Sequence, residues 1–248
     1  MHARTRSIAI LALLVVTAGC LGAPGVGDSP GTGIDAAPDG DTMATAHQDG
    51  LAAAGSYTYT AEAGATVDGR SAGSSTLSAA VDLNADRTLV ETDTALGPAT
   101  TYVESGTAYQ RVGAEEPQYR TLDVNASAGE VVSTDVAPVI ANHTFEANGT
   151  GTVNGQQVRT FEARATGSNA TLPTDLGAGI TVESVTVVLS VREDGVIVEQ
   201  RTQAELALDG GETDGTYTRT VTYTDVGDTD VAAPDWVDDA REAGSADA

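Results

Sequence analysis

The strongest constraint on the fold is an alternation of apolar and polar residues that recurs in several segments from residue 57 to residue 224. It is clearest where Tyr217, Arg219, Val221 and Tyr223 alternate with four threonines. Successive side chains of a strand point to opposite faces of a sheet, so this pattern is typical of strands with one buried and one solvated face. The other segments with this pattern are 57–62, 77–83, 185–191 and 204–208. The sequence therefore predicts a mainly β domain.

Turn dipeptides separate the predicted strands. Ser105-Gly106, Asn154-Gly155 and Asp194-Gly195 each lie between two such segments. Asn-Gly and Asp-Gly favour two-residue hairpins, whose central residues need positive φ. We expect roughly eight to eleven antiparallel strands in hairpins and meanders. A βαβ rhythm is absent from the sequence, which argues against a parallel doubly wound sheet.

Two helices are expected beside the sheet. Residues 41–54 have apolar positions at helical spacing, with Asp41 or Thr42 as the cap and Gly55 as the stop. A second, short helix is expected within 127–142, where Ser127 and Glu130 have the spacing of a capping box. Pro138 would break any longer helix there. The expected fold class is thus α+β, with one helix at the start of the sheet and one in mid-chain.

The N-terminus has the layout of an export signal. Arg4 and Arg6 precede the apolar stretch 8–16, which is too short for a spanning helix of about 20 residues. Thr17-Ala18-Gly19-Cys20 resembles a lipobox, in which the cysteine receives a diacylglycerol group through a thioether. We expect residues 1–19 to be a signal peptide and Cys20 to be lipidated, which predicts a cell-membrane protein on the extracellular face. The alternative is an ordinary signal peptide with an incidental cysteine.

The remaining chain divides by composition. Residues 20–40 are rich in Gly, Pro and Asp and predict a flexible acidic tether. Residues 41–240 form the predicted antiparallel β domain, and residues 241–248 a frayed acidic tail. Asp225 to Ala240 carries the single tryptophan, Trp236. Trp236 is expected either to plug one end of the core or to form the rim of a ligand cavity.

Charge constrains the environment and the partners. The formal net charge is −24, all 12 basic residues are arginine, and the 36 acidic residues are spread along the chain. Such a chain is a poor binder of nucleic acid, because nothing would neutralise the phosphates. At molar salt the Debye length falls to about 3 Å, so the carboxylates barely repel one another. The composition favours a halophilic source over an acidic protein from ordinary salt.

A search for catalytic or metal-binding patterns is negative, so we expect no enzyme activity, no catalytic residues, no metal and no cofactor. His47 is expected to be a surface or half-buried helix residue, and His143 a solvent-facing residue at a strand edge. With one cysteine, the mature chain lacks the ligand set of a transition-metal site. Four Asn-x-Ser/Thr sequons are candidates for N-glycosylation: Asn125, Asn142, Asn148 and Asn169.

Together these features resemble an uncharacterised family of haloarchaeal lipoproteins. The resemblance is carried by the lipobox, the Gly/Pro/Asp tether, Gly55-Ser56-Tyr57-Thr58, the mid-chain helix and the closing Pro234-Asp235-Trp236. The order of elements is also similar to the LolA/LppX-type lipoprotein carrier fold. That resemblance implies a curved antiparallel half-barrel with helices over its concave side.

The leading hypothesis is a non-enzymatic surface lipoprotein that binds a lipid or another apolar or amphipathic ligand in the half-barrel. Its expected partners are this ligand and the membrane, and not nucleic acid. The candidate cavity-wall residues are Tyr57, Tyr59, Leu77, Val81, Val187, Leu189, Tyr217, Tyr223 and Trp236. Two alternatives remain open. These side chains can form a closed core, or the domain can be a structural or protein-interaction module without a pocket.

Overall fold

The computed structural model describes residues 38–124, 126–127, 129–132, 137–141, 143–170, 172, 179–208 and 213–246. Its helices are α1 (Gly40–Ala54), α2 (Ala137–Ala141) and α3 (Val237–Ala246), with a 3-10 turn η1 (Gly167–Asn169). The first six strands are β1 (Ser56–Val67), β2 (Arg70–Asp82), β3 (Arg87–Thr94), β4 (Gly97–Glu104), β5 (Thr107–Val112) and β6 (Gln118–Asp123). The other five are β7 (Glu146–Val153), β8 (Gln156–Thr166), β9 (Ile180–Val191), β10 (Ile197–Leu208) and β11 (Thr213–Thr224).

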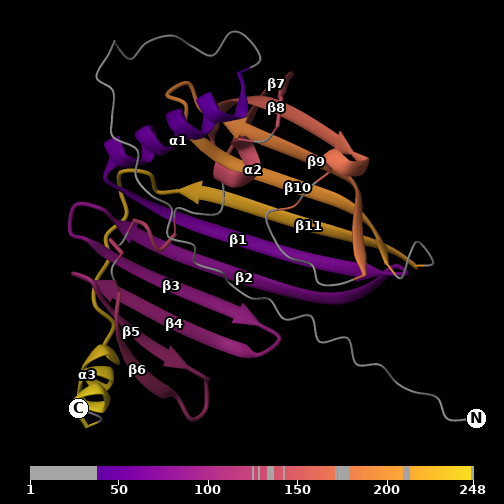
Figure 1. The fold of residues 1–248 in the computed structure, drawn as a ribbon. Helices are drawn as coiled ribbons and strands as arrows, with labels where there is room; N and C mark the ends of the chain where they lie inside the picture. Colours follow the sequence, from indigo (N-terminus) through magenta and orange to yellow (C-terminus); the bar gives the residue numbers. More distant parts are fainter. Residues whose placement is uncertain are drawn as a thin grey trace, which may run out of the picture.

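All these strands belong to one antiparallel sheet of 11 strands, in the order β6-β5-β4-β3-β2-β1-β11-β10-β9-β8-β7. Two meanders, β1–β6 and β7–β11, meet where β1 pairs with β11 in the middle of the sheet. The sheet is open and curved, with β6 and β7 at its two edges (Figure 1). The expected class is therefore confirmed: a mainly antiparallel sheet with a helix at its start and another in mid-chain.

The hairpins form where the turn dipeptides predict them. Ser105 and Gly106 have φ values of 50° and 78°, and Asn154 and Gly155 have 50° and 79°. Two successive positive φ values match the right-handed twist of the flanking strands. Gly195, with φ of 87°, is constrained further, because a Cβ there would lie 3.0 Å from Ala46 of α1.

The helix boundaries differ in detail from the expectation. Asp39, and not Asp41 or Thr42, caps α1: its Oδ1 accepts a hydrogen bond from the Thr42 backbone N–H at 2.8 Å. Gly55 ends α1 as expected, with φ of 77°. The mid-chain helix α2 is shorter than the predicted range. Ser127 and Glu130 do bond to each other, but they lie in a turn before α2.

The C-terminal segment also differs from the expectation. Residues 241–246, expected to be a frayed tail, continue helix α3. This helix is held against β6, because the Thr121 hydroxyl donates a hydrogen bond to the Ala240 carbonyl at 2.9 Å. Figure 1 shows α3 beside β5 and β6, away from α1 and α2. The acidic residues of this segment lie on the exposed side of α3, whereas Val237 and Ala240 are buried.

Two apolar clusters lie on opposite faces of the sheet. The helix face, defined as the side that Tyr59 and Leu189 occupy, packs against Met43 and Leu51 of α1 and Ile140 of α2. The opposite side, called the back face, carries a smaller cluster around Tyr102. Val231, Trp236 and Val237 of the C-terminal segment and Leu89 of β3 complete that cluster. The alternation therefore buries part of both faces, not one face alone.

Both described histidines are buried, which corrects the expectation for them. His47 is 4% exposed, accepts a hydrogen bond from the Ile197 N–H at 3.2 Å, and packs edge-on against Tyr223. His143 is 9% exposed, and its Nδ1 lies 2.6 Å from the Val139 carbonyl oxygen. Each imidazole joins a helix to the rest of the core, a role that the local sequence does not reveal.

His47 makes stability pH-dependent. Burial lowers its pKa from 6.5 to about 4. Between these values the unfolded chain binds more protons than the folded chain, so the free energy of unfolding falls as pH falls. We expect a loss of roughly 3 kcal/mol across this window, at about 1.4 kcal/mol per pKa unit. Urea unfolding at several pH values measures it, and His47→Gln should lack this component. Equal pH slopes for the two proteins would contradict the assignment.

Candidate functional site

The structure places the candidate wall residues in three groups. The first group is packed in the closed core of the helix face and is 5% exposed or less: Tyr57, Tyr59, Val81, Val187, Leu189 and Tyr223. Leu77 and Tyr217 are half-buried at the margin of that core. Trp236 lies on the back face, where its ring stacks on Tyr119 at 6.4 Å. Trp236 therefore does not share a wall with the others, because the C-terminal segment passes behind the sheet.

A polar cluster interrupts the apolar helix face, formed by Tyr59, Gln200, Thr202 and Arg219. Arg219 Nη2 donates a hydrogen bond to the Tyr59 hydroxyl at 2.8 Å. Gln200 Nε2 donates to the Thr202 hydroxyl at 3.2 Å. Thr202 is the direct cross-strand partner of Arg219, so β10 and β11 bring the two pairs together on one face. Sequence reasoning did not single out this cluster.

Gln200 is the unusual member of the polar cluster. It is 0% exposed, and its Oε1 has no hydrogen-bond partner among the described residues. Leaving a buried acceptor unsatisfied costs about 1–3 kcal/mol. Most buried polar atoms in proteins have partners, so such an atom calls for an explanation. A ligand that donates a hydrogen bond to Oε1 would provide one.

An apolar strip leads from the polar cluster toward the ends of the strands. It consists of Tyr217 on β11, Val182 and Ile180 on β9, and Leu208 on β10, all only partly buried. Their register places them on the helix face, beyond Ala204 and away from α1. The helix face thus has a dry half beneath the helices and a less buried apolar half, with the polar cluster between them.

A signal for this arrangement was present in the alternation itself. Arg219 stands in phase with Tyr217, Val221 and Tyr223, which face the core. Gln200 likewise stands in phase with Ala204 on β10. A long polar side chain at a core position is rare unless it is paired. The alternation placed both residues on the apolar face, where Gln200 is buried and Arg219 half-buried, but it could not show that they lie close together.

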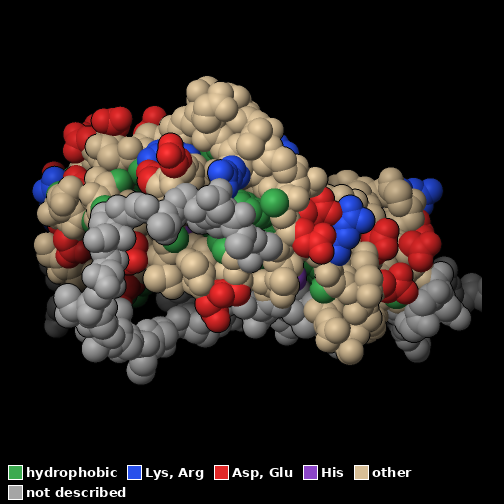
Figure 2. Space-filling model, turned by 90° about the horizontal axis from the view of Figure 1, so that it is seen from above, with side chains coloured by type: hydrophobic (Ala, Val, Ile, Leu, Met, Phe, Trp, Pro, Cys, Tyr) green, Lys and Arg blue, Asp and Glu red, His purple; other side chains and the backbone are tan. Residues whose placement is uncertain are grey.

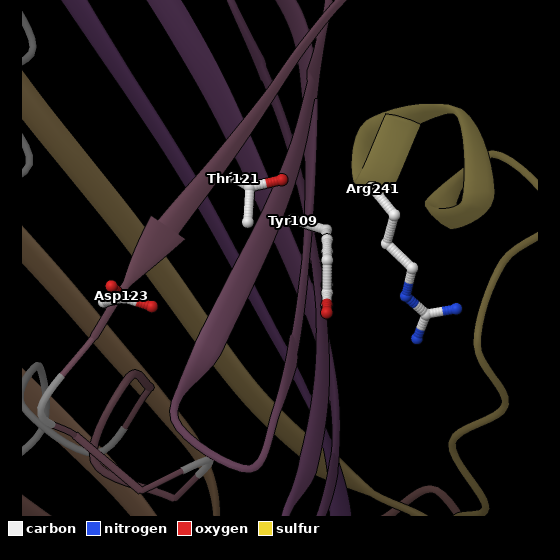
Figure 3. A pocket seen from close by; sticks show the side chains of 4 residues that line it. All are labelled: Tyr109, Thr121, Asp123 and Arg241. Carbon is white, nitrogen blue, oxygen red and sulfur yellow. The ribbon is translucent and has the colours of Figure 1, made fainter. Parts of the chain in front are cut away.

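Two hollows are described, and both lie on the back face. One, of about 330 Å³, is lined by Tyr109, Thr121, Asp123 and Arg241 (Figure 3). The other, of about 310 Å³, lies over β1, β2 and β11 and is lined mainly by hydroxyl-bearing side chains beside Glu62. Neither includes a candidate wall residue, so neither is the expected half-barrel cavity.

The charged groups do not gather into one site. Figure 2 shows Asp and Glu side chains in several separate groups on the face seen from above, some of them beside arginines. Arg87 pairs with Glu104 at 2.8 Å and Arg201 with Glu199 at 2.7 Å. In each pair the arginine is the more exposed partner, and ion pairs at a protein surface are worth about 0–1 kcal/mol each. Within the described part of the chain, no group of three or more His, Cys, Asp or Glu residues could hold a metal ion.

Several expected sites lie outside the described residues: the signal peptide, Cys20, most of the tether, Asn125 and Asn142. Asn148 lies on the edge strand β7 and is exposed, with its side-chain amide bonded to Glu162 at 2.9 Å. Asn169, in η1, is also exposed. Both of these asparagines are therefore accessible. Among the helices of the described segments, none has the length and apolar character needed to cross a membrane.

Comparison with known proteins gives a family. A model described as "Family of unknown function (DUF7537)" matches residues 4–240. The chain belongs to this family. No curated protein matches the chain. The family match spans the segment from the expected export signal to the end of the β domain.

Three solved structures illustrate what the fold is similar to. The lipoprotein LppX of Mycobacterium tuberculosis is 10% identical, with a TM-score of 0.47, and the match covers 78% of this chain and 98% of that one. LprF of Mycobacterium bovis is 12% identical, with a TM-score of 0.41, and the match covers 78% of this chain and 96% of that one. A LolA superfamily protein of Nitrosomonas europaea is 8% identical, with a TM-score of 0.28, and the match covers 81% of this chain and 97% of that one. The expected LolA- and LppX-type neighbours are thus found, as distant likenesses that do not extend to activity or ligand.

Proposed function

We propose that this chain is a non-enzymatic surface lipoprotein that binds an amphipathic ligand on the helix face of its sheet. The single observation that carries the proposal is the unpartnered Oε1 of Gln200, buried beside the Arg219–Tyr59 pair. A binding site is typically apolar with a few convergent polar groups that fix the orientation of the ligand. The polar cluster and the adjoining apolar strip have that composition.

The chemistry of the polar cluster suggests the polar end of the ligand. Gln200 Oε1 accepts a hydrogen bond, whereas the guanidinium of Arg219 donates. A headgroup that both donates and accepts, such as a hydroxyl or an amide, matches this pair. The hydrocarbon part would then follow Tyr217, Val182 and Leu208 toward the ends of the strands. Access requires the closed packing beneath α1 and α2 to open, because the adjacent core residues are fully buried.

The proposal includes attachment to the outer face of the cell membrane of a halophilic archaeon. Its support is in the sequence: residues 1–19 have the layout of a signal peptide, and Cys20 ends a lipobox-like tetrapeptide. A net charge of −24 without lysine supports the halophilic source. The tether 20–40 would separate the β domain from the lipid headgroups.

A second candidate function is a structural or interaction module without a ligand. The observation that favours it is the tight packing of six candidate wall residues on the helix face, among them Val81, Val187 and Leu189. In that case the polar cluster only orients the strands. The two functions differ in whether Gln200 contacts a small molecule, and a substitution at that position separates them.

The test compares ligand content in matched variants. The mature protein is purified from membranes in molar salt, extracted with organic solvent, and the extract is analysed by mass spectrometry. We expect a near-stoichiometric amphipath with the wild type and about tenfold less with Gln200→Leu, because one buried hydrogen bond of about 1.4 kcal/mol corresponds to tenfold in affinity. Gln203→Leu, an exposed position on the same strand, is the control and should retain the ligand.

The stability of the same variants shows whether a loss of ligand is caused by unfolding of the protein. Gln200→Leu removes the unsatisfied acceptor and also the hydrogen bond from Nε2 to Thr202, so the two effects offset each other and the free energy of unfolding should stay within about 1 kcal/mol of the wild type. Loss of ligand from a protein of undiminished stability would therefore report binding and not unfolding. An empty wild-type extract, or equal ligand in wild type and Gln200→Leu, would favour the module without a pocket.

A further inference from the structure

The 330 Å³ hollow on the back face lies outside the proposed ligand site. It opens between α3 and the β5–β6 hairpin, and the C-terminal segment forms one of its sides (Figure 3). Its volume is at the lower end of the range for small-molecule sites, about 300–1,000 Å³. Four groups of different chemistry line it: a phenol ring, a hydroxyl, a carboxylate and a guanidinium.

The guanidinium of Arg241 is held in place from several sides. Its Nη1 donates a hydrogen bond to Asp238 at 2.8 Å, and its Nη2 lies 3.7 Å from Glu104. Its Cζ lies 5.1 Å from the centre of the Tyr109 ring. A hydrogen bond with Tyr109 raises the pKa of Arg241 further, so the group stays charged. A guanidinium has five N–H donors in a planar fork, and these contacts hold that fork at the side of the hollow.

The other polar groups supply acceptors. Asp123 is exposed, and in the described part of the chain its carboxylate has no hydrogen-bond or ion-pair partner. The Thr121 hydroxyl donates its proton to the Ala240 carbonyl, which leaves its oxygen lone pairs available as acceptors. The hollow therefore offers carboxylate and hydroxyl acceptors on β6 and a guanidinium donor on α3. Figure 3 shows Tyr109 between Thr121 and Arg241.

We infer that this hollow binds a polyhydroxylated ligand, of the class of a monosaccharide unit. Adjacent hydroxyls both donate and accept, so a carboxylate can accept from two of them while a guanidinium donates to a third oxygen. A simple anion does not suit the site, because Asp123 and Glu104 would repel it. The lining also lacks the aliphatic side chains that an acyl chain would need. This site is separate from the polar cluster, which lies on the opposite face.

The test uses ligand-observed NMR and calorimetry with glucose, galactose, mannose and N-acetylglucosamine, on the full mature chain. We expect at least one sugar to bind the wild type with a millimolar dissociation constant. Asp123→Asn should weaken that binding about tenfold, because the charge-assisted bonds become neutral ones. Asp93→Asn, an exposed carboxylate near the tip of the β3–β4 hairpin, changes the net charge equally and should bind like the wild type.

Other outcomes would overturn the inference. Absence of binding for all four sugars would do so, as would equal binding by the wild type and Asp123→Asn. Inorganic phosphate is included as a probe, and binding of phosphate in preference to the sugars would indicate an anion site at Arg241 instead. Asp123 is exposed, and its carboxylate makes no hydrogen bond or ion pair within the described residues, so Asp123→Asn should unfold at the same urea concentration as the wild type. That control keeps a loss of binding interpretable.

Discussion

Cys20→Ser is expected to move the mature protein from the detergent phase to the aqueous phase of a detergent partition. Each buried methylene contributes about 0.8 kcal/mol to membrane attachment, and stable anchoring needs two acyl chains. The diacylglycerol group on Cys20 would provide both, through a thioether that a serine hydroxyl does not form.

The control for the anchor is Ser29→Ala, a substitution of similar size inside the tether. This variant should partition like the wild type and carry the same mass increment on its N-terminal peptide. If Cys20→Ser still entered the detergent phase, or if Cys20 of the wild type were unmodified, the anchor would have to be abandoned. The proposal of a ligand site on the helix face would not be affected by that result.

Tyr223→Ala is expected to cause the largest loss of stability among single substitutions in the core. Its ring, 5% exposed, contacts three other rings: His47 at 4.6 Å, Tyr59 at 5.2 Å and Tyr57 at 5.8 Å. Removing a buried aromatic side chain costs about 3–5 kcal/mol, and the three ring contacts place this position at the upper end. Urea unfolding in molar salt measures the change.

The matched control is Tyr119→Ala on the edge strand β6. Tyr119 is half-buried and has one ring contact, with Trp236 at 6.4 Å. Its loss should cost about 1–2 kcal/mol, because less area returns to water and the cavity left behind is open to solvent. Equal losses for the two variants would mean that Tyr223 does not organise the contact between α1 and the sheet.

Local chemistry was sufficient to predict the strands and the hairpins. The Ser105-Gly106 and Asn154-Gly155 turns impose positive φ on two successive residues, and the flanking alternation fixes which face is buried. Gly55 likewise ends α1 through its own left-handed conformation, which does not depend on distant residues. These features depend on residues close together in the sequence. The pairing of β1 with β11 joins residues more than 140 apart, and the turn and alternation rules do not specify it.

The candidate site was predicted only in part, for the same reason. Six of the candidate wall residues occupy buried strand positions, whereas Leu77 and Tyr217 are half-buried and Trp236 lies on the back face. Burial in the alternation does not distinguish a closed core from a cavity wall. The importance of Gln200 depends on partners that β10 meets across the sheet. Similarly, α3 is only weakly apolar, and Arg241 acquires its role through contacts with Tyr109 and Glu104 on other elements.

The most direct test of the account is native mass spectrometry of the mature protein, released from membranes in a mild detergent. The account predicts two mass increments above the chain that begins at Cys20. One is a covalent diacylglycerol increment that persists after denaturation. The other is a non-covalent increment of one amphipathic molecule that denaturation removes, and that Gln200→Leu largely lacks. A protein that carries the covalent increment alone, in both wild type and variant, would contradict the binding function.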